Sequence, residues 1–61
     1  MMLKEGDKVQ SGLGAEGVVE AVEIGKDGQE LVWIRWKTGV LGAYTREEVS
    51  RYKIVKVATS P

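Results

Sequence analysis

Eight glycines divide this 61-residue chain into short pieces, and their spacing limits the fold more than any other feature of the sequence. Before residue 43, no glycine-free apolar stretch has the 3.6-residue period of a helix. The pieces have the length of strands, so the sequence predicts a sheet of short strands joined by tight turns. The glycines are Gly6, Gly12, Gly14, Gly17, Gly25, Gly28, Gly39 and Gly42.

Five segments have the residue types and alternation of β-strands. The clearest is Glu30–Lys37 (ELVWIRWK), in which Val32, Ile34 and Trp36 share one face because side chains alternate along a strand. We expect this apolar face to line the core and the mixed odd-numbered face to point outward. The other strands are expected at Leu3–Gln10, Gly17–Ile24, Val40–Tyr44 and Tyr52–Val57.

The segments between the strands carry turn and cap signals. Gly25–Gly28 (GKDG) predicts a hairpin turn, because Asp-Gly tolerates the positive φ angles of tight hairpins. The imperfect alternation of Gly17–Ile24 predicts a bulge near Glu20 or burial on both faces. Thr45, followed three residues later by Glu48, has the pattern of a capping box and predicts one helical or 3₁₀ turn.

Five short strands cannot cover an apolar face and both sheet edges if the sheet stays flat. We therefore expect an all-β fold, a five-stranded, strongly bent and nearly closed antiparallel barrel with one short helical turn before the last strand. The whole chain, residues 1–61, is expected to form one domain with an ordered core at about residues 3–57. Ala58–Pro61 is expected to be a frayed tail.

The chain contains neither cysteine nor histidine. This excludes disulfides, thiolate and imidazole metal sites, and catalysis that depends on histidine. The carboxylates show no metal-site spacing, so we expect no metal and no cofactor. No apolar run has the length of a membrane span and no signal-peptide pattern opens the chain, so a cytoplasmic protein without membrane contact is expected.

The net charge is zero, but the two halves of the chain differ. Residues 1–30 carry three cations against seven carboxylates, whereas residues 31–61 carry six cations against two carboxylates. Such a split predicts either an anion-binding or head-to-tail contact surface, or two halves that interleave and pair their charges locally. The isoelectric point of about 6.2 is lower than that of most nucleic-acid-binding domains.

Trp33 is the most informative single residue. On the outer face of its strand it would lie beside Arg35, and exposed indoles anchor protein interfaces and stack on bases. Alternatively, Trp33 covers a small second core under the loop at Ser11–Gly14. Trp36 is expected to pack in the core with its apolar neighbours.

Aromatic and basic residues also gather late in the chain. Aromatic rings among cations can stack on bases while the cations neutralise phosphates. Alternatively, the tyrosines close the barrel with their hydroxyls at its rim, and the cations are solvated. The residues are Tyr44, Arg46, Arg51, Tyr52 and Lys53.

The order of these signals resembles the SH3-like small barrels, including KOW and Tudor-like modules. The resemblance covers most of residues 4–57 and rests on Gly6–Val9 (GDKV), Gly14–Val19 (GAEGVV) and Val32–Gly39 (VWIRWKTG). It implies a five-stranded barrel whose ligands meet loops and strand ends near the late aromatic and basic residues. It does not define a function, because this fold carries many functions.

A weaker resemblance links the chain to the plasmid-type, type II dihydrofolate reductases. Those barrels share the Gly-Asp-x-Val opening and a late tyrosine, and their active site forms at the centre of a homotetramer from a Val-Gln-Ile-Tyr run. The matching stretch is Leu41–Tyr44 (LGAY), in which Gly42 replaces the glutamine. The resemblance therefore does not imply reductase activity, although it leaves homo-oligomerisation open.

The sequence favours a non-enzymatic binding or assembly module that contacts a protein, including another copy of itself. The first alternative is a nucleic-acid-binding module, and the second is a subunit of a small oligomeric enzyme. The expected binding surface consists of Trp33, Arg35, Tyr44, Arg46, Arg51 and Lys53.

Overall fold

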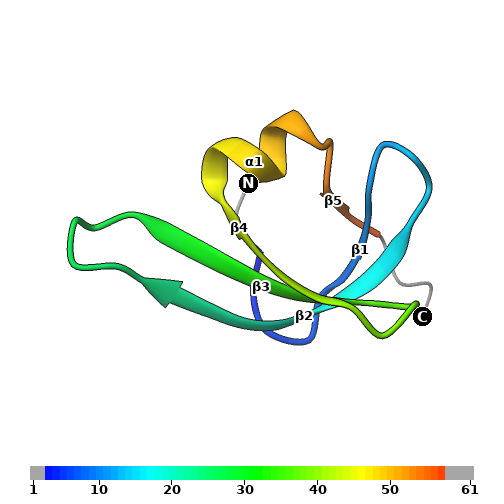
Figure 1. The fold of residues 1–61 in the computed structure, drawn as a ribbon, viewed down its shortest axis with the longest axis horizontal. Coiled ribbons are helices and arrows are strands. Elements are labelled where there is room, and N and C mark those ends of the chain that lie inside the picture. The colour runs from blue at the N-terminus through cyan, green and yellow to red at the C-terminus, as the bar shows by residue number, and fades with distance from the viewer. Residues whose placement is uncertain (1–2, 58–61) are drawn as a thin grey trace.

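Five antiparallel strands and one short helix make up the structure, a computed structural model that describes residues 3–57 (Figure 1). The strands run across the sheet in the order β4-β3-β2-β1-β5. The all-β class and the helical turn before the last strand are therefore confirmed. The elements are β1 (Lys8–Gln10), β2 (Glu16–Ile24), β3 (Glu30–Trp36), β4 (Leu41–Thr45), α1 (Arg46–Arg51) and β5 (Val55–Lys56). The predicted tail at Ala58–Pro61 lies outside the described residues.

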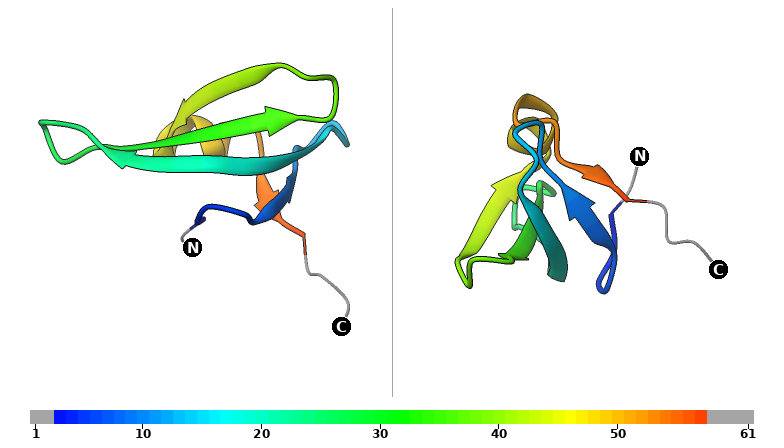
Figure 2. Two further views of the ribbon diagram at one scale, coloured as in Figure 1. Left: turned by 90° about the horizontal axis from the view of Figure 1, so that it is seen from below. Right: turned by 90° about the vertical axis from the view of Figure 1, so that its right-hand side faces the viewer.

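The long strand β2 pairs with β1 over its first residues and with β3 along its length. The register between β2 and β3 shifts between Val19 and Ala21, which leaves Glu20 as the extra residue of a bulge. This confirms the bulge that the imperfect alternation predicted. A bulge bends the strand and increases its twist, and Figure 2 shows β1 and β5 turned steeply away from the direction of β3 and β4.

The sheet is not closed into a barrel. Within residues 3–57 no ladder joins β4 to β5, so these two strands are the edges of the sheet. The expectation that near-closure would hide both edges is therefore wrong. Helix α1 packs against β3 and β4, and only a short strand follows it.

The way α1 ends explains why β5 is so short. Lys53 N–H donates to Ser50 O at 3.1 Å and Ile54 N–H donates to Val49 O at 2.9 Å. Lys53 has a φ of +53°, in the left-handed region. These are the bonds of a Schellman motif, which takes up Tyr52 as the C-cap and Lys53 as the left-handed residue. The predicted start of the last strand at Tyr52 is thus wrong, because Tyr52 and Lys53 form the C-terminal cap of α1 and the strand begins only after them.

The start of α1 has the capping box that the sequence predicted. Thr45 Oγ1 accepts a hydrogen bond from the Glu48 N–H at 3.2 Å, and Glu48 Oε1 accepts one from the Thr45 N–H at 2.9 Å. One backbone donor at the end of β4 and one in the first turn of α1 are satisfied in this way, so the chain turns from strand to helix without a loop.

The core is small and lies between the sheet and the α1 end of the chain. In β3, Val32 and Ile34 are 2% and 0% exposed and Trp36 packs against them, as the alternation predicted. Among residues 3–57, six apolar residues are buried: Leu3, Val9, Val19, Val32, Ile34 and Ile54. No helix of residues 3–57 is long and apolar enough to cross a membrane.

Candidate functional site

Two glycines lie where the large rings of the site pack against the backbone. Gly17 is paired with Trp36 across β2 and β3, and a Cβ on Gly17 would lie 2.8 Å from Cε3 of that indole. A Cβ on Gly42 would lie 2.5 Å from the hydroxyl oxygen of Tyr44. Any side chain at either position would displace the ring above it, so these glycines fix where both rings lie.

Trp36, Tyr44 and Tyr52 form one cluster of rings. Trp36 Nε1–H donates to the Tyr44 hydroxyl at 2.8 Å, and their ring centroids are 6.1 Å apart at 81°. Tyr44 and Tyr52 are also 6.1 Å apart, at 82°. Edge-to-face contacts of this kind stabilise aromatic pairs beyond their area of burial. The three rings come from β3, β4 and the end of α1, so the fold joins distant parts of the sequence here.

This cluster lines an open groove of about 580 Å³, which we call the aromatic groove. It lies between the β1–β2 loop and the segment that follows α1. Leu13 in that loop is fully exposed, and Tyr52 is about half exposed. The groove is lined by Ser11, Gly12, Leu13, Ala15, Trp36, Tyr44, Arg51, Tyr52, Lys53 and Ile54.

The ionisable side chains at the edge of the aromatic groove are cationic. Among residues 3–57, Arg51 and Lys53 line it and no carboxylate does. Arg51 Nη2 pairs with Glu47 Oε1 at 3.1 Å, and both side chains are well exposed. Within residues 3–57, Lys53 takes part in none of the ion pairs. The groove therefore combines an aromatic and apolar wall with a positive edge.

Trp33 and Arg35 lie on the opposite face of the sheet, and carboxylates bond to both. Trp33 Nε1–H donates to Glu23 Oε1 at 2.6 Å, and Arg35 Nε–H donates to Glu20 Oε1 at 2.6 Å. Trp33 is half-buried rather than fully exposed. The indole N–H and the guanidinium are thus already bonded to carboxylates of β2, which leaves both groups less available to a ligand.

The structure does not gather the six predicted residues on one surface. Tyr44 is paired with Val32 and packs toward the core, whereas Trp33 is paired with Ala43 and points the other way. Arg46 lies apart, at the β2–β3 hairpin end of the molecule beside Ile24. Only Tyr44, Arg51 and Lys53 come together, in the aromatic groove.

Sequence reasoning missed two parts of the aromatic groove. Trp36 was expected only in the core, but one edge of its indole lines the groove while the ring packs on Gly17. Leu13 was not identified, although a large apolar residue between two glycines is a signal of an exposed loop tip.

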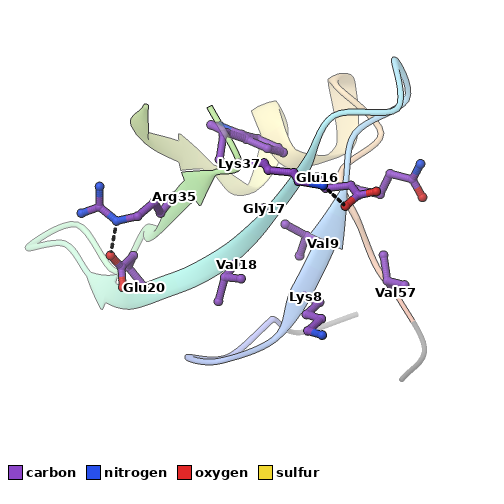
Figure 3. A pocket seen from close by; sticks show the side chains of 11 residues that line it. Lys8, Val9, Glu16, Gly17, Val18, Glu20, Arg35, Lys37 and Val57 are labelled. Atoms are coloured by element: carbon purple, nitrogen blue, oxygen red, sulfur yellow. Dashed lines mark hydrogen bonds and ion pairs between the residues drawn. The ribbon is translucent and has the colours of Figure 1, made fainter. Parts of the chain in front are cut away.

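A second hollow is lined mainly by residues of β1, β2 and β3 (Figure 3). Its charges pair across the strands: Arg35 with Glu20 at 2.6 Å, and Lys37 Nζ with Glu16 Oε1 at 3.9 Å. Figure 3 shows the Arg35–Glu20 pair to one side of the exposed Val18 and the Lys37–Glu16 pair farther along β2. Lys8 also lines this hollow, but the other two cations are paired with its two carboxylates, so most of its charge is neutralised in pairs.

The ion pairs also bear on the charge split of the sequence. Arg35 and Lys37 of the basic half pair with carboxylates of the acidic half, and Lys56 Nζ pairs with Asp7 Oδ1 at 3.6 Å. The two halves therefore interleave and neutralise each other locally. This supports the second interpretation of the charge split, because β1 and β2 lie between β3 and β5 in the sheet.

Within residues 3–57 no group of three or more Asp or Glu side chains is arranged to hold a metal ion. No protein-family profile, no curated protein and no solved structure matches this chain.

Proposed function

We propose that this chain is a small, non-enzymatic SH3-like binding module that holds an acidic segment of a partner protein in the aromatic groove. The strand order and the helix before the last strand support the SH3-like assignment. The aromatic groove supports the binding role, because Trp, Tyr and Arg, three of the residue types that line it, are the types enriched where protein segments dock.

The left-handed conformation of Lys53 is the observation that carries the proposal. Glycine is the usual residue at this position of a Schellman motif, since a side chain there costs roughly 1 kcal/mol. Strained residues of this kind gather at functional sites. Here the strain places a cation at the edge of a groove lined by three aromatic rings. We infer that the lysine is kept for its charge.

The charge of the aromatic groove indicates the class of partner. Lys53, which forms no ion pair within residues 3–57, would repel a cationic segment and attract a carboxylate, and Arg51, which shares its charge with Glu47, would add to this less strongly. A segment that places an apolar side chain between Leu13 and Tyr52 and a carboxylate near Lys53 would satisfy both features of the groove.

The same observations weigh against the alternatives. Four of the six cations in residues 31–61 are in ion pairs, so few are available to phosphates. A reductase-like site would need an amide side chain at position 42, where Tyr44 fills the space above Gly42. A protein segment is therefore the partner that the groove fits best.

Selection of random peptides against the immobilised protein tests the proposal. We expect the selected peptides to be enriched in Asp and Glu around an apolar residue. Tyr52→Ala should weaken their binding by about fivefold or more, as for a residue at the centre of an interface. Trp33→Ala, which removes an aromatic ring from the opposite face, is the matched control and should leave binding unchanged.

Lys53→Gly separates stability from binding. It should raise the free energy of unfolding by roughly 1 kcal/mol because glycine relieves the left-handed strain. The same variant should weaken the binding of the acidic peptides by about fivefold, which corresponds to the loss of one ion pair at a partly exposed site. Peptides without acidic enrichment, or binding that depends on Trp33 rather than Tyr52, would refute the proposal, as would a selection that yields no binders.

A further inference from the structure

Strand β4 forms one edge of the sheet, and half of its backbone groups point away from β3. Trp36 N–H donates to Val40 O at 2.8 Å where the two strands meet. Because bonding groups alternate along an antiparallel strand, those of Leu41, Ala43 and Thr45 must point outward. The Thr45 N–H agrees with this phase, since it donates into the helix cap rather than to β3.

The outward groups of Leu41 and Ala43 are left without partners within the described chain. No backbone or side-chain hydrogen bond outside the ladder joins either residue to the rest of residues 3–57. Each residue thus presents one N–H donor and one C=O acceptor at the open edge. An edge with a regular row of such groups is a template for another strand.

The sequence of this edge lacks the usual protection against pairing. Monomeric proteins protect edge strands with charges, prolines, bulges or short length. Thr38–Thr45 is the longest stretch of the chain without a charged residue, and it contains no proline. Val40 and Leu41 on this edge are 60% and 44% exposed.

The opposite edge has the protection that β4 lacks. Strand β5 has two residues, and one of them is Lys56, which pairs with Asp7. The difference between the two edges indicates that β4 is the edge built to be covered.

We propose that β4 pairs antiparallel with β4 of a second copy, about a twofold axis that passes through Gly42. In this register Leu41 lies opposite Ala43 of the second copy, and the two exchange both of their hydrogen bonds. The symmetric pair does the same, so all the outward groups of both residues are satisfied. An axis through Ala43 would instead require the Thr45 N–H, which the helix cap already uses.

The side chains fit the same register. The two Gly42 residues meet at the axis as a close, non-hydrogen-bonded pair, where the absence of side chains lets the strands approach. Val40 comes to lie opposite Tyr44 of the second copy. Leu41 comes to lie near Trp33 of the second copy, because that Trp33 is paired with the Ala43 opposite Leu41. Both exposed aliphatic residues are covered, and the contact is the self-complementary kind found in twofold dimers.

Light scattering and amide hydrogen exchange on the full chain test this pairing. The interface is small, so we expect a dimer that forms at concentrations of roughly micromolar to millimolar. Between dilute and concentrated samples, exchange of the Leu41 and Ala43 amides should slow by up to about tenfold, because a net hydrogen bond contributes up to that factor. The outward amide of Lys56 on the other edge is the internal control and should not change.

A charge on β4 should prevent the dimer. Leu41→Lys should remain monomeric while it stays folded, whereas Val55→Lys, at a residue of similar exposure on β5, should still dimerise. A protein that stays monomeric up to about 1 mM, a concentration at which even weak pairs associate, would overturn the proposal. A dimer that survives Leu41→Lys, or that leaves the Leu41 and Ala43 amides unprotected, would overturn it equally.

Discussion

Replacing Gly17 with alanine tests how tightly β2 lies against β3. The added Cβ would lie 2.8 Å from Trp36 Cε3, 2.9 Å from Arg35 O and 2.9 Å from Ile34 Cγ2. One of these atoms belongs to the backbone and another to the most buried side chain of the core, so neither can move aside easily. The strands must therefore separate or the indole must shift.

The expected change in the free energy of unfolding is the difference between two opposing effects. Overpacking of this kind costs about 1–3 kcal/mol. Alanine recovers roughly 0.4–1 kcal/mol by restricting the unfolded chain, since Gly17 does not need a positive φ. The net loss is about 1–2 kcal/mol, against a total stability of roughly 3–9 kcal/mol for a chain of this length. A loss of this size lowers the melting temperature by roughly 5–15 °C.

Urea unfolding followed by circular dichroism measures this loss directly. Gly12→Ala is the comparison variant, because a Cβ there would meet Lys53 Cβ at 3.1 Å and Tyr52 O at 3.4 Å, so its contacts are less close than the three at Gly17. We expect Gly12→Ala to lower the free energy of unfolding by less than Gly17→Ala does, because its contacts are longer and lie outside the buried core. If Gly17→Ala were as stable as Gly12→Ala, the close contact between β2 and the Trp36 ring would be wrong.

Three further substitutions test the cap, the core and the surface charges. Thr45→Ala should lower the free energy of unfolding by about 1 kcal/mol in thermal melts, because the capping box loses an acceptor for the Glu48 N–H. Ile34→Val should cost about 0.5–1.5 kcal/mol in urea unfolding, since the residue is fully buried; an unchanged midpoint would contradict its place in the core. Arg35→Gln should cost less than about 1 kcal/mol, because Arg35 and Glu20 are half exposed, and the difference should shrink further at about 1 M salt. A loss that persists in salt would mean that the ion pair is less solvated than the structure indicates.

The strands that alternate regularly could be predicted closely from the sequence. The even-numbered apolar face of β3 lies in the core and the bulge falls at Glu20, because burial and alternation are local properties of a strand. The end of the chain could not be predicted as well. Tyr52 and Lys53 resemble the start of an apolar strand, yet the helix before them needs a cap, and that hydrogen-bonding requirement prevails over β propensity.

The candidate site was predictable only in part. Tyr44, Arg51 and Lys53 meet in one groove, as their clustering suggested. Trp33 and Arg35 were placed on the correct face of β3, but that face is not the one to which Tyr44 belongs. The hydrogen bonds from Trp33 and Arg35 to carboxylates on β2 depend on strand register, which the sequence of one strand does not define.

The overlap between the Tyr44 ring and the space above Gly42 links these two positions in evolution and in engineering. A longer residue at 42 is acceptable only after the tyrosine has been replaced, and replacing the tyrosine first leaves the Trp36 indole N–H without its acceptor. Either single step is unfavourable, whereas a double change that brings a hydrogen-bond acceptor at position 42 avoids the crowding and can again satisfy the indole N–H. Homologous chains should therefore show residues 42 and 44 changing together. A small residue at 42 should occur with an aromatic residue at 44, and a large residue at 42 with a non-aromatic residue at 44.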